Sequence, residues 1–257
     1  MSLTGKSLSQ FWKDLLHVDN NNNSLLGTKR VKTGSGVQTP LEISTSHLSV
    51  KPKLDATTTF SVETQGGAKI LEVDTSNTEV TAGSGQHVVN TMYKEFGLFD
   101  FSPTAGYHAP MITTPMMVSD SGDDIIHNTT FGGNGSTPAA TLTSNHHLIP
   151  ACAWYIEDVC KIDSVRLLGS SEGTCSLKFY LYEYDMDVST DYGDLSGGTT
   201  LGSLGTMSLS ADQCKTATMI LGSGSTRVAA DKVVVMFCES NATDDITVKG
   251  LIKYHLL

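Results

Sequence analysis

Apolar and polar residues alternate along several stretches of this 257-residue chain. Between Cys175 and Leu181 every second residue is apolar, and the intervening residues are Ser, Lys and Tyr. Successive side chains of a strand point to opposite faces of a sheet, so a period of two predicts a strand with one buried face. Residues 246–257 alternate in the same way. Residues 232–239 form a continuous apolar run, which predicts a strand covered on both faces.

The composition fits a chain made mostly of strands and turns. Thr and Ser number 31 and 28, Gly numbers 24, and only 17% of residues are charged. Thr favours strands, whereas Gly and Ser favour turns. Hydrophobic residues, at 39%, are still sufficient for a core. We therefore predict a mostly-β fold in which residues 91–257 form a C-terminal β-sandwich, jelly-roll-like head.

One short helix is predicted in the N-terminal segment, residues 1–59. Ser7-Leu-Ser-Gln10 matches a capping box, and the asparagine run at 20–23 ends the helix. The apolar residues at helical spacing are Leu8, Phe11, Trp12, Leu15 and Leu16. A helix this short is marginal alone in water. The stripe must therefore dock on the rest of the chain, on sister chains or on another protein.

Residues 60–90 predict a brief shaft of short strands. Two alternating strands flank Gln65-Gly66-Gly67, and residues 74–77 turn towards a third strand. The apolar residues of this segment, predicted to form one buried face, are Phe60, Val62, Ile70, Val73 and Val80. They are too few for a core within one chain, and small ribbons are marginal unless packed on something else. Copies wrapped about a threefold axis would supply that packing, so this segment predicts an intertwined homotrimer.

Charge and cysteine content exclude several partners. The formal net charge of −10 argues against nucleic acid as a main partner, because phosphate binding needs basic patches. No apolar run approaches the roughly 18 residues of a membrane helix, and no secretory signal is evident at the start. The five cysteines lack CxxC spacing, so we expect free thiols and folding in a reducing cytoplasm.

No stretch of the sequence predicts a catalytic or metal site. Residues 185–194 carry acidic side chains at alternating positions but lack the glycine and glutamate of an EF-hand, which favours a solvated loop. His146 and His147 are adjacent and have no clear third metal ligand. Neither a promising Gly-x-Ser-x-Gly elbow nor a separated carboxylate pair for sugar hydrolysis is evident. We therefore expect a non-enzymatic protein that needs no metal and no cofactor.

Tyrosines are the best candidates for a ligand surface. Those on or beside one strand face are Tyr180, Tyr182, Tyr184 and Tyr192. A tyrosine offers a flat apolar body and a hydroxyl, which suits sugar recognition and protein interfaces alike. The alternative is that this face packs on a neighbouring subunit.

About half of the chain resembles fibre proteins of short-tailed marine bacteriophages. The N-terminal motifs are Leu15-Leu-His-Val-Asp-Asn-Asn-Asn22, Thr28-Lys-Arg-Val-Lys-Thr-Gly-Ser-Gly36 and Pro40-Leu-Glu-Ile-Ser44. Lys69-Ile-Leu-Glu-Val-Asp-Thr-Ser-Asn77 is similar to the repeating shaft element of such fibres. Residues 230–237 and 244–254 resemble their distal heads.

The resemblance implies a homotrimeric virion protein made in the host cytoplasm. Its N-terminal stripe would anchor the fibre to other virion proteins of the tail or capsid, without membrane insertion. Its head would face outward for a host cell-surface receptor, and three linked heads would gain avidity. Two alternatives stay open: a capsid decoration or head-fibre protein that braces the shell, and a carbohydrate-binding module.

Overall fold

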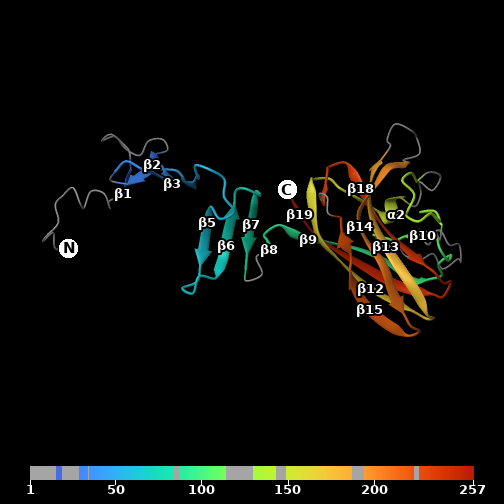
Figure 1. The fold of residues 1–257 in the computed structure, drawn as a ribbon. Helices are drawn as coiled ribbons and strands as arrows, with labels where there is room; N and C mark the ends of the chain where they lie inside the picture. The colour runs from blue at the N-terminus through green and yellow to red at the C-terminus, as the bar shows by residue number, and fades with distance from the viewer. Residues whose placement is uncertain are drawn as a thin grey trace. The chain divides into compact units, whose positions relative to one another are not determined.

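The computed structural model describes residues 16–18, 29–33, 35–83, 87–113, 130–142, 149–186, 194–222 and 226–257. The chain divides into two compact units, Met1–Val89 and Asn90–Leu257, which we call the small unit and the large unit (Figure 1). Within the described residues the only helix is α2 (Ile149–Cys152). The prediction of a mostly-β, sandwich-like fold is confirmed.

The small unit holds two four-stranded antiparallel sheets, each with its strands in chain order. The first sheet consists of β1 (Leu16–Val18), β2 (Lys29–Thr33), β3 (Gln38–Ile43) and β4 (Leu48–Val50). The second sheet consists of β5 (Phe60–Glu63), β6 (Lys69–Asp74), β7 (Glu79–Ala82) and β8 (His87–Val88). Gly67, at φ 82°, occupies the left-handed region in the turn between β5 and β6, which explains the glycine pair there.

The predicted N-terminal helix is wrong at its end. Leu16 and His17 lie in β1 and pair with Thr33 and Lys32 of β2. Pairing with a neighbouring strand satisfies the backbone groups there and overrides the helical spacing of the side chains. The other residues of the predicted stripe lie outside the described residues: Leu8, Phe11, Trp12 and Leu15.

The large unit is a sandwich of two antiparallel sheets. The first, which we call the β13 sheet, has the order β10-β18-β13-β14-β16, with β11 paired to β18. Its strands are β10 (His108–Pro110), β11 (Ala153–Tyr155), β13 (Cys175–Met186), β14 (Leu195–Leu209), β16 (Ile220–Leu221) and β18 (Lys232–Ser240). The second, the β12 sheet, has the order β15-β12-β19-β9, with β17 paired to β12. Its strands are β9 (Thr91–Phe101), β12 (Cys160–Ser171), β15 (Gln213–Thr218), β17 (Arg227–Val228) and β19 (Ile246–Leu256).

The main core lies between the two sheets. Leu177 and Phe179 of β13 pack in one cluster with Val165 and Leu167 of β12, and each is at most 2% exposed. This arrangement confirms the buried face predicted from the alternation between residues 175 and 181.

A second core cluster covers the outer face of the β13 sheet. Val233, Val235 and Phe237 of β18 belong to it, whereas Val234 and Met236 of the same strand belong to the main core. Strand β18 is therefore covered on both faces, as its continuous apolar run predicts. The residues that pack over the sheet from outside include Phe131, Leu142 and Ile149.

Strand register defines two opposite ends of the β12 sheet. At one end Thr91 pairs with His255, and Asn90 donates a hydrogen bond to the carbonyl of Leu256 at 2.8 Å. At the other end Phe101 pairs with Ile246. Strand β9 has 11 residues and separates these ends by roughly 33 Å. We call them the entry end, where the chain enters the large unit, and the far end.

Candidate functional surfaces

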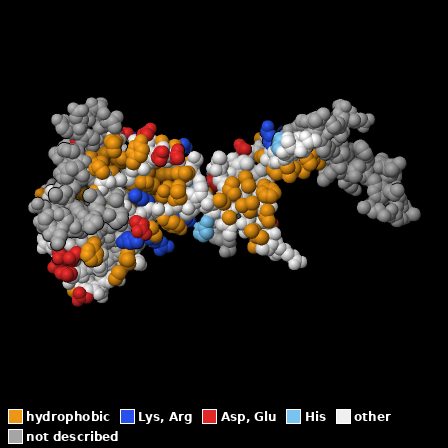
Figure 2. All heavy atoms as spheres, turned by 180° about the vertical axis from the view of Figure 1, so that it is seen from behind, with side chains coloured by type: hydrophobic (Ala, Val, Ile, Leu, Met, Phe, Trp, Pro, Cys, Tyr) orange, Lys and Arg blue, Asp and Glu red, His pale blue; other side chains and the backbone are white. Residues whose placement is uncertain are grey.

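The second sheet of the small unit exposes an apolar face, and Figure 2 shows hydrophobic side chains gathered on it. Residues directly opposite one another in paired strands share a face. Phe60 lies opposite Val73, which lies opposite Val80; Val62 lies opposite Leu71, which lies opposite Ala82. The face therefore consists of Phe60, Val62, Leu71, Val73, Val80 and Ala82, and we call it the shaft face.

The assignment of Ile70 to this face is wrong. Leu71 and Val73 lie on the shaft face, so Ile70 and Glu72 point to the opposite side of β6. Ile70 and Val73 are three residues apart, so they cannot share a face in a regular strand, and the strand pairing groups Val73 with Leu71. The register of β5 with β6 includes an irregularity between Val62 and Glu63.

The described residues of one chain leave much of the shaft face exposed. Phe60, Val62 and Val80 are 40%, 41% and 39% exposed. Among the described residues of the small unit, only Val31 and Glu72 are buried. The described part of this unit therefore lacks a hydrophobic core, and its sheets need packing from elsewhere to be stable.

Ion pairs support the small sheets on their polar sides. The Glu72 carboxylate accepts hydrogen bonds from Lys69 Nζ and Thr58 Oγ1, and the Lys69 bond is the main cause that lowers its pKa. In the first sheet Arg30 donates to Glu42 and lowers the pKa of that carboxyl. Both carboxylates thus favour the charged form in the folded state.

The predicted tyrosine ligand surface is wrong for the three tyrosines that the structure describes. Tyr180, Tyr182 and Tyr184 are 8%, 5% and 0% exposed. Tyr180 Oη donates to the carbonyl of Ser136 at 3.2 Å, and Tyr184 Oη donates to that of Ala139 at 2.8 Å. The chain's own residues 130–142 cover this face, rather than a ligand or a neighbouring subunit. Tyr192 lies outside the described residues.

A buried polar cluster holds residues 130–142 against the β13 sheet. The fully buried His108 places Nδ1 3.0 Å from the carbonyl of Gly133 and Nε2 3.3 Å from Glu239 Oε2. Lys178 Nζ donates to Glu239 Oε1 at 2.9 Å, and this bond raises the pKa of Lys178. His108 is fully buried, and the cluster joins β10, β13 and β18 to residues 130–142.

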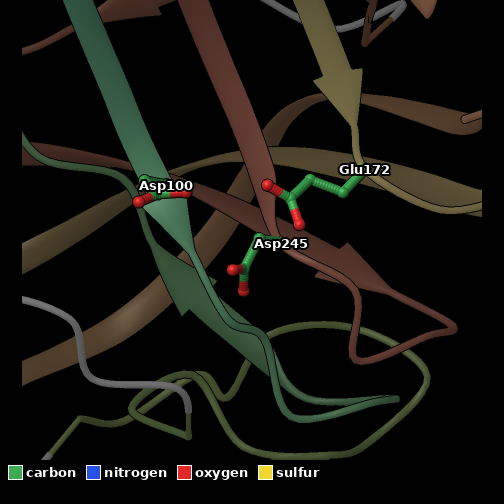
Figure 3. Close-up of side chains that lie close together, drawn as sticks. All are labelled: Asp100, Glu172 and Asp245. Atoms are coloured by element: carbon green, nitrogen blue, oxygen red, sulfur yellow. The ribbon is translucent and has the colours of Figure 1, made fainter. Parts of the chain in front are cut away.

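Three carboxylates converge at the far end of the sandwich (Figure 3). Asp100 is the last but one residue of β9, Glu172 follows β12 and Asp245 precedes β19; their ligand oxygens lie within 4.8 Å of one another. Glu172 N donates to the Asp245 carbonyl at 3.0 Å, which ties the two turns together. The adjoining groove, of about 280 Å³, adds hydroxyl, amide and thiol groups from Ser170, Gln213 and Cys214 among others.

Carboxylate oxygens are the ligands that calcium and magnesium prefer. Calcium takes six to eight oxygens, whereas this cluster offers three side chains, two of them exposed. The acidic loop considered from sequence lies mostly outside the described residues, and Asp185 at its start pairs with Lys232. The absence of a metal requirement stays a prediction.

Comparisons with known proteins add little. No protein-family model matches the sequence, and no curated protein matches it. Among solved structures, a chain in the structure of infectious bursal disease virus, Gx strain, is similar at 10% sequence identity and a TM-score of 0.20. The match covers 100% of the present chain and 57% of the viral chain. So low a TM-score supports no conclusion. Among the described residues, no helix is long and apolar enough to cross a bilayer.

Proposed function

We propose that this chain is a structural virion protein that forms a short homotrimeric fibre. The observation that carries the proposal is the uncovered shaft face in a unit whose described residues lack a hydrophobic core. An apolar sheet face of this kind is stabilised when it packs on another apolar surface. Identical copies supply such a surface without any further gene product.

Three copies suit the shaft face better than one. Around a threefold axis each narrow face meets two others, while the opposite side, with Glu72, Lys69 and Ile70, faces away from the axis. The resemblance of Lys69-Ile-Leu-Glu-Val-Asp-Thr-Ser-Asn77 to a fibre shaft element favours a trimer over a flat two-sheet dimer. The closed symmetry also limits the assembly to a defined size.

The proposed fibre is attached through its N-terminal segment. Leu8, Phe11, Trp12, Leu15 and Leu16 would contact a tail or capsid protein. The large unit would act as the adhesive head, and its far end, opposite the entry of the chain at Asn90, is the candidate contact region. Three heads on one axis raise the effective concentration of weak contacts.

The trimer is tested by light scattering on the full chain after size-exclusion chromatography. We expect a mass three times the 27.4 kDa of one chain. Val80→Lys places a charge on the shaft face and should dissociate the trimer at micromolar concentration. The matched control Ile70→Lys changes a residue that is 50% exposed on the opposite face and should leave the mass unchanged. A monomeric wild type, or two variants that behave alike, would refute the role of the shaft face.

Adhesion is tested separately from assembly. A fluorescent trimer that labels host cells supports the adhesive role. A trimer that binds emptied capsids and leaves cells unlabelled would instead assign the chain to shell decoration.

A further inference from the structure

A recess of about 230 Å³ opens at the entry end of the sandwich. Three aromatic side chains, a methionine and two carboxylates give it its chemistry: Trp154, Tyr155, Tyr254, Met92, Glu157 and Asp158. Each of these residues belongs to the large unit, so the recess is complete within one chain. The fibre described above makes no use of it.

The aromatic groups of the recess are held in place by their neighbours. The rings of Trp154 and Tyr254 lie 4.6 Å apart at an interplanar angle of 57°. Tyr155 is 49% exposed, and its hydroxyl donates to Asp231, which fixes the ring at the edge of β11. The recess therefore offers aromatic surface whose ordering needs little further entropy on binding.

The charged residues that line the recess are acidic. Glu157 and Asp158 line it, Asp231 accepts the hydrogen bond of Tyr155, and no Lys or Arg is among the described lining residues. Anions are disfavoured by this arrangement and cations are attracted. A neutral sugar could rest on the aromatic rings and donate its hydroxyls to the carboxylates, but it would gain nothing from their net charge.

We propose that this recess binds a quaternary ammonium group, such as the trimethylammonium head of a choline-like compound. Such a cation is bulky and weakly hydrated, so it enters an aromatic recess at a small desolvation cost. Aromatic π systems attract it, and nearby carboxylates balance its charge. A recess of this volume accommodates one such group. This binding does not depend on the trimer, so it can hold or fail independently of the proposed fibre.

Calorimetric titration of the full chain tests the proposal with choline as the probe. We expect a dissociation constant on the order of 1 mM, with binding about tenfold weaker for 3,3-dimethylbutan-1-ol, the neutral isostere of choline. Equal affinity for the two compounds would overturn the proposal, because charge would then contribute nothing. Binding of neutral methyl glycosides without binding of choline would overturn it as well and would assign the recess to sugars.

Variants connect the binding to the recess. Tyr155→Ala should weaken choline binding by about fivefold, while Tyr155→Phe keeps the ring and should stay within about twofold of the wild type. Glu157→Gln should also weaken choline binding, because it removes a negative charge from the rim of the recess. Phe99→Ala is the control, because Phe99 is 75% exposed near the far end of the sandwich. Unchanged binding in Tyr155→Ala, or a loss in Phe99→Ala that matches it, would place the site elsewhere.

A vesicle assay distinguishes the two sources of the group. Binding to phosphatidylcholine vesicles, with none to phosphatidylglycerol vesicles, would support a lipid headgroup as ligand. Binding of free choline alone would support a small solute. Light scattering on the same samples shows whether a variant that has lost binding still assembles.

Discussion

The hydroxyl of Tyr184 donates a 2.8 Å hydrogen bond to the main-chain carbonyl of Ala139. The tyrosine, a residue of β13, is fully buried. Burial raises the pKa of Tyr184, so the phenol stays protonated and remains a donor through the ordinary pH range. Residues 130–142 are thereby joined to the second core cluster. Removing this contact should lower the free energy of unfolding.

Two substitutions of Tyr184 test its packing against residues 130–142. Tyr184→Phe removes only the hydrogen bond and should lower the free energy of unfolding by about 1 kcal/mol. Tyr184→Ala also removes the ring and should lower it by about 3–5 kcal/mol. Urea denaturation of the full chain measures both changes. A Tyr184→Ala variant as stable as the wild type would show that residues 130–142 do not pack on the sheet.

Gly132 provides a second test of the same packing. A Cβ atom there would lie 2.7 Å from His108 Cβ and 2.9 Å from Phe237 Cδ1. Gly132→Ala should therefore destabilise the large unit by about 1–3 kcal/mol, as overpacking does. Gly205→Ala is the matched control, because a Cβ at Gly205 would meet nothing within 4 Å. Thermal denaturation should separate the two variants.

The five cysteines should differ sharply in reactivity. Cys214 is exposed, whereas the other four are buried. Burial raises the pKa of Cys152 to about 12 and that of Cys160 to about 11, so their reactive thiolates are scarce near neutral pH. Mass spectrometry after brief maleimide treatment at pH 7.5 should find one modified thiol per native chain and five per unfolded chain. The Cys214→Ser variant should stay unmodified; rapid labelling of Cys152 in it would contradict the burial.

Acid should weaken the small unit first. The folded pKa values of Glu42 and Glu72 lie below the ordinary value of 4.5, so the folded state holds fewer protons than the unfolded state. Their stabilisation is present above pH 4.5 and is lost as the pH falls through the folded pKa values. Hydrogen exchange of β6 amides should therefore rise more steeply below pH 4.5 in the wild type than in Glu72→Gln. If hydrogen exchange in Glu72→Gln depended on pH as it does in the wild type, Glu72 would not contribute to the acid sensitivity.

The strands of the sandwich could be predicted from the sequence because each carries its own signal. The alternation after Cys175 and the apolar run after Lys232 report burial residue by residue, and both strands are found where expected. The cover over Tyr184 could not be predicted, because residues 130–142 pack through single side chains and main-chain carbonyls without any period. Alternation shows that two faces differ but does not show whether the second face is covered.

Register and long-range pairing explain the other misses. Ile70 and Leu71 are adjacent and both apolar, and the pairing of β5, β6 and β7 places Leu71 on the shaft face with Val73. Asp100, near the end of β9, and Asp245, just before β19, are far apart in the chain, and only the pairing of these two strands brings them together. Trp154 and Tyr254 likewise meet only after β11 and β19 are placed in their sheets.

The position of β19 has a consequence for synthesis on the ribosome. This strand lies between β12 and β9 in its sheet, yet it is the last strand of the unit to be translated. Until it emerges, β9 and β12 each lack a neighbour, and apolar side chains such as Phe96 and Val165 have an incomplete cover. Chains released early would expose these strand edges to proteases and aggregation. The topology thus favours chains translated through β19 over truncated products, because only they can complete the β12 sheet.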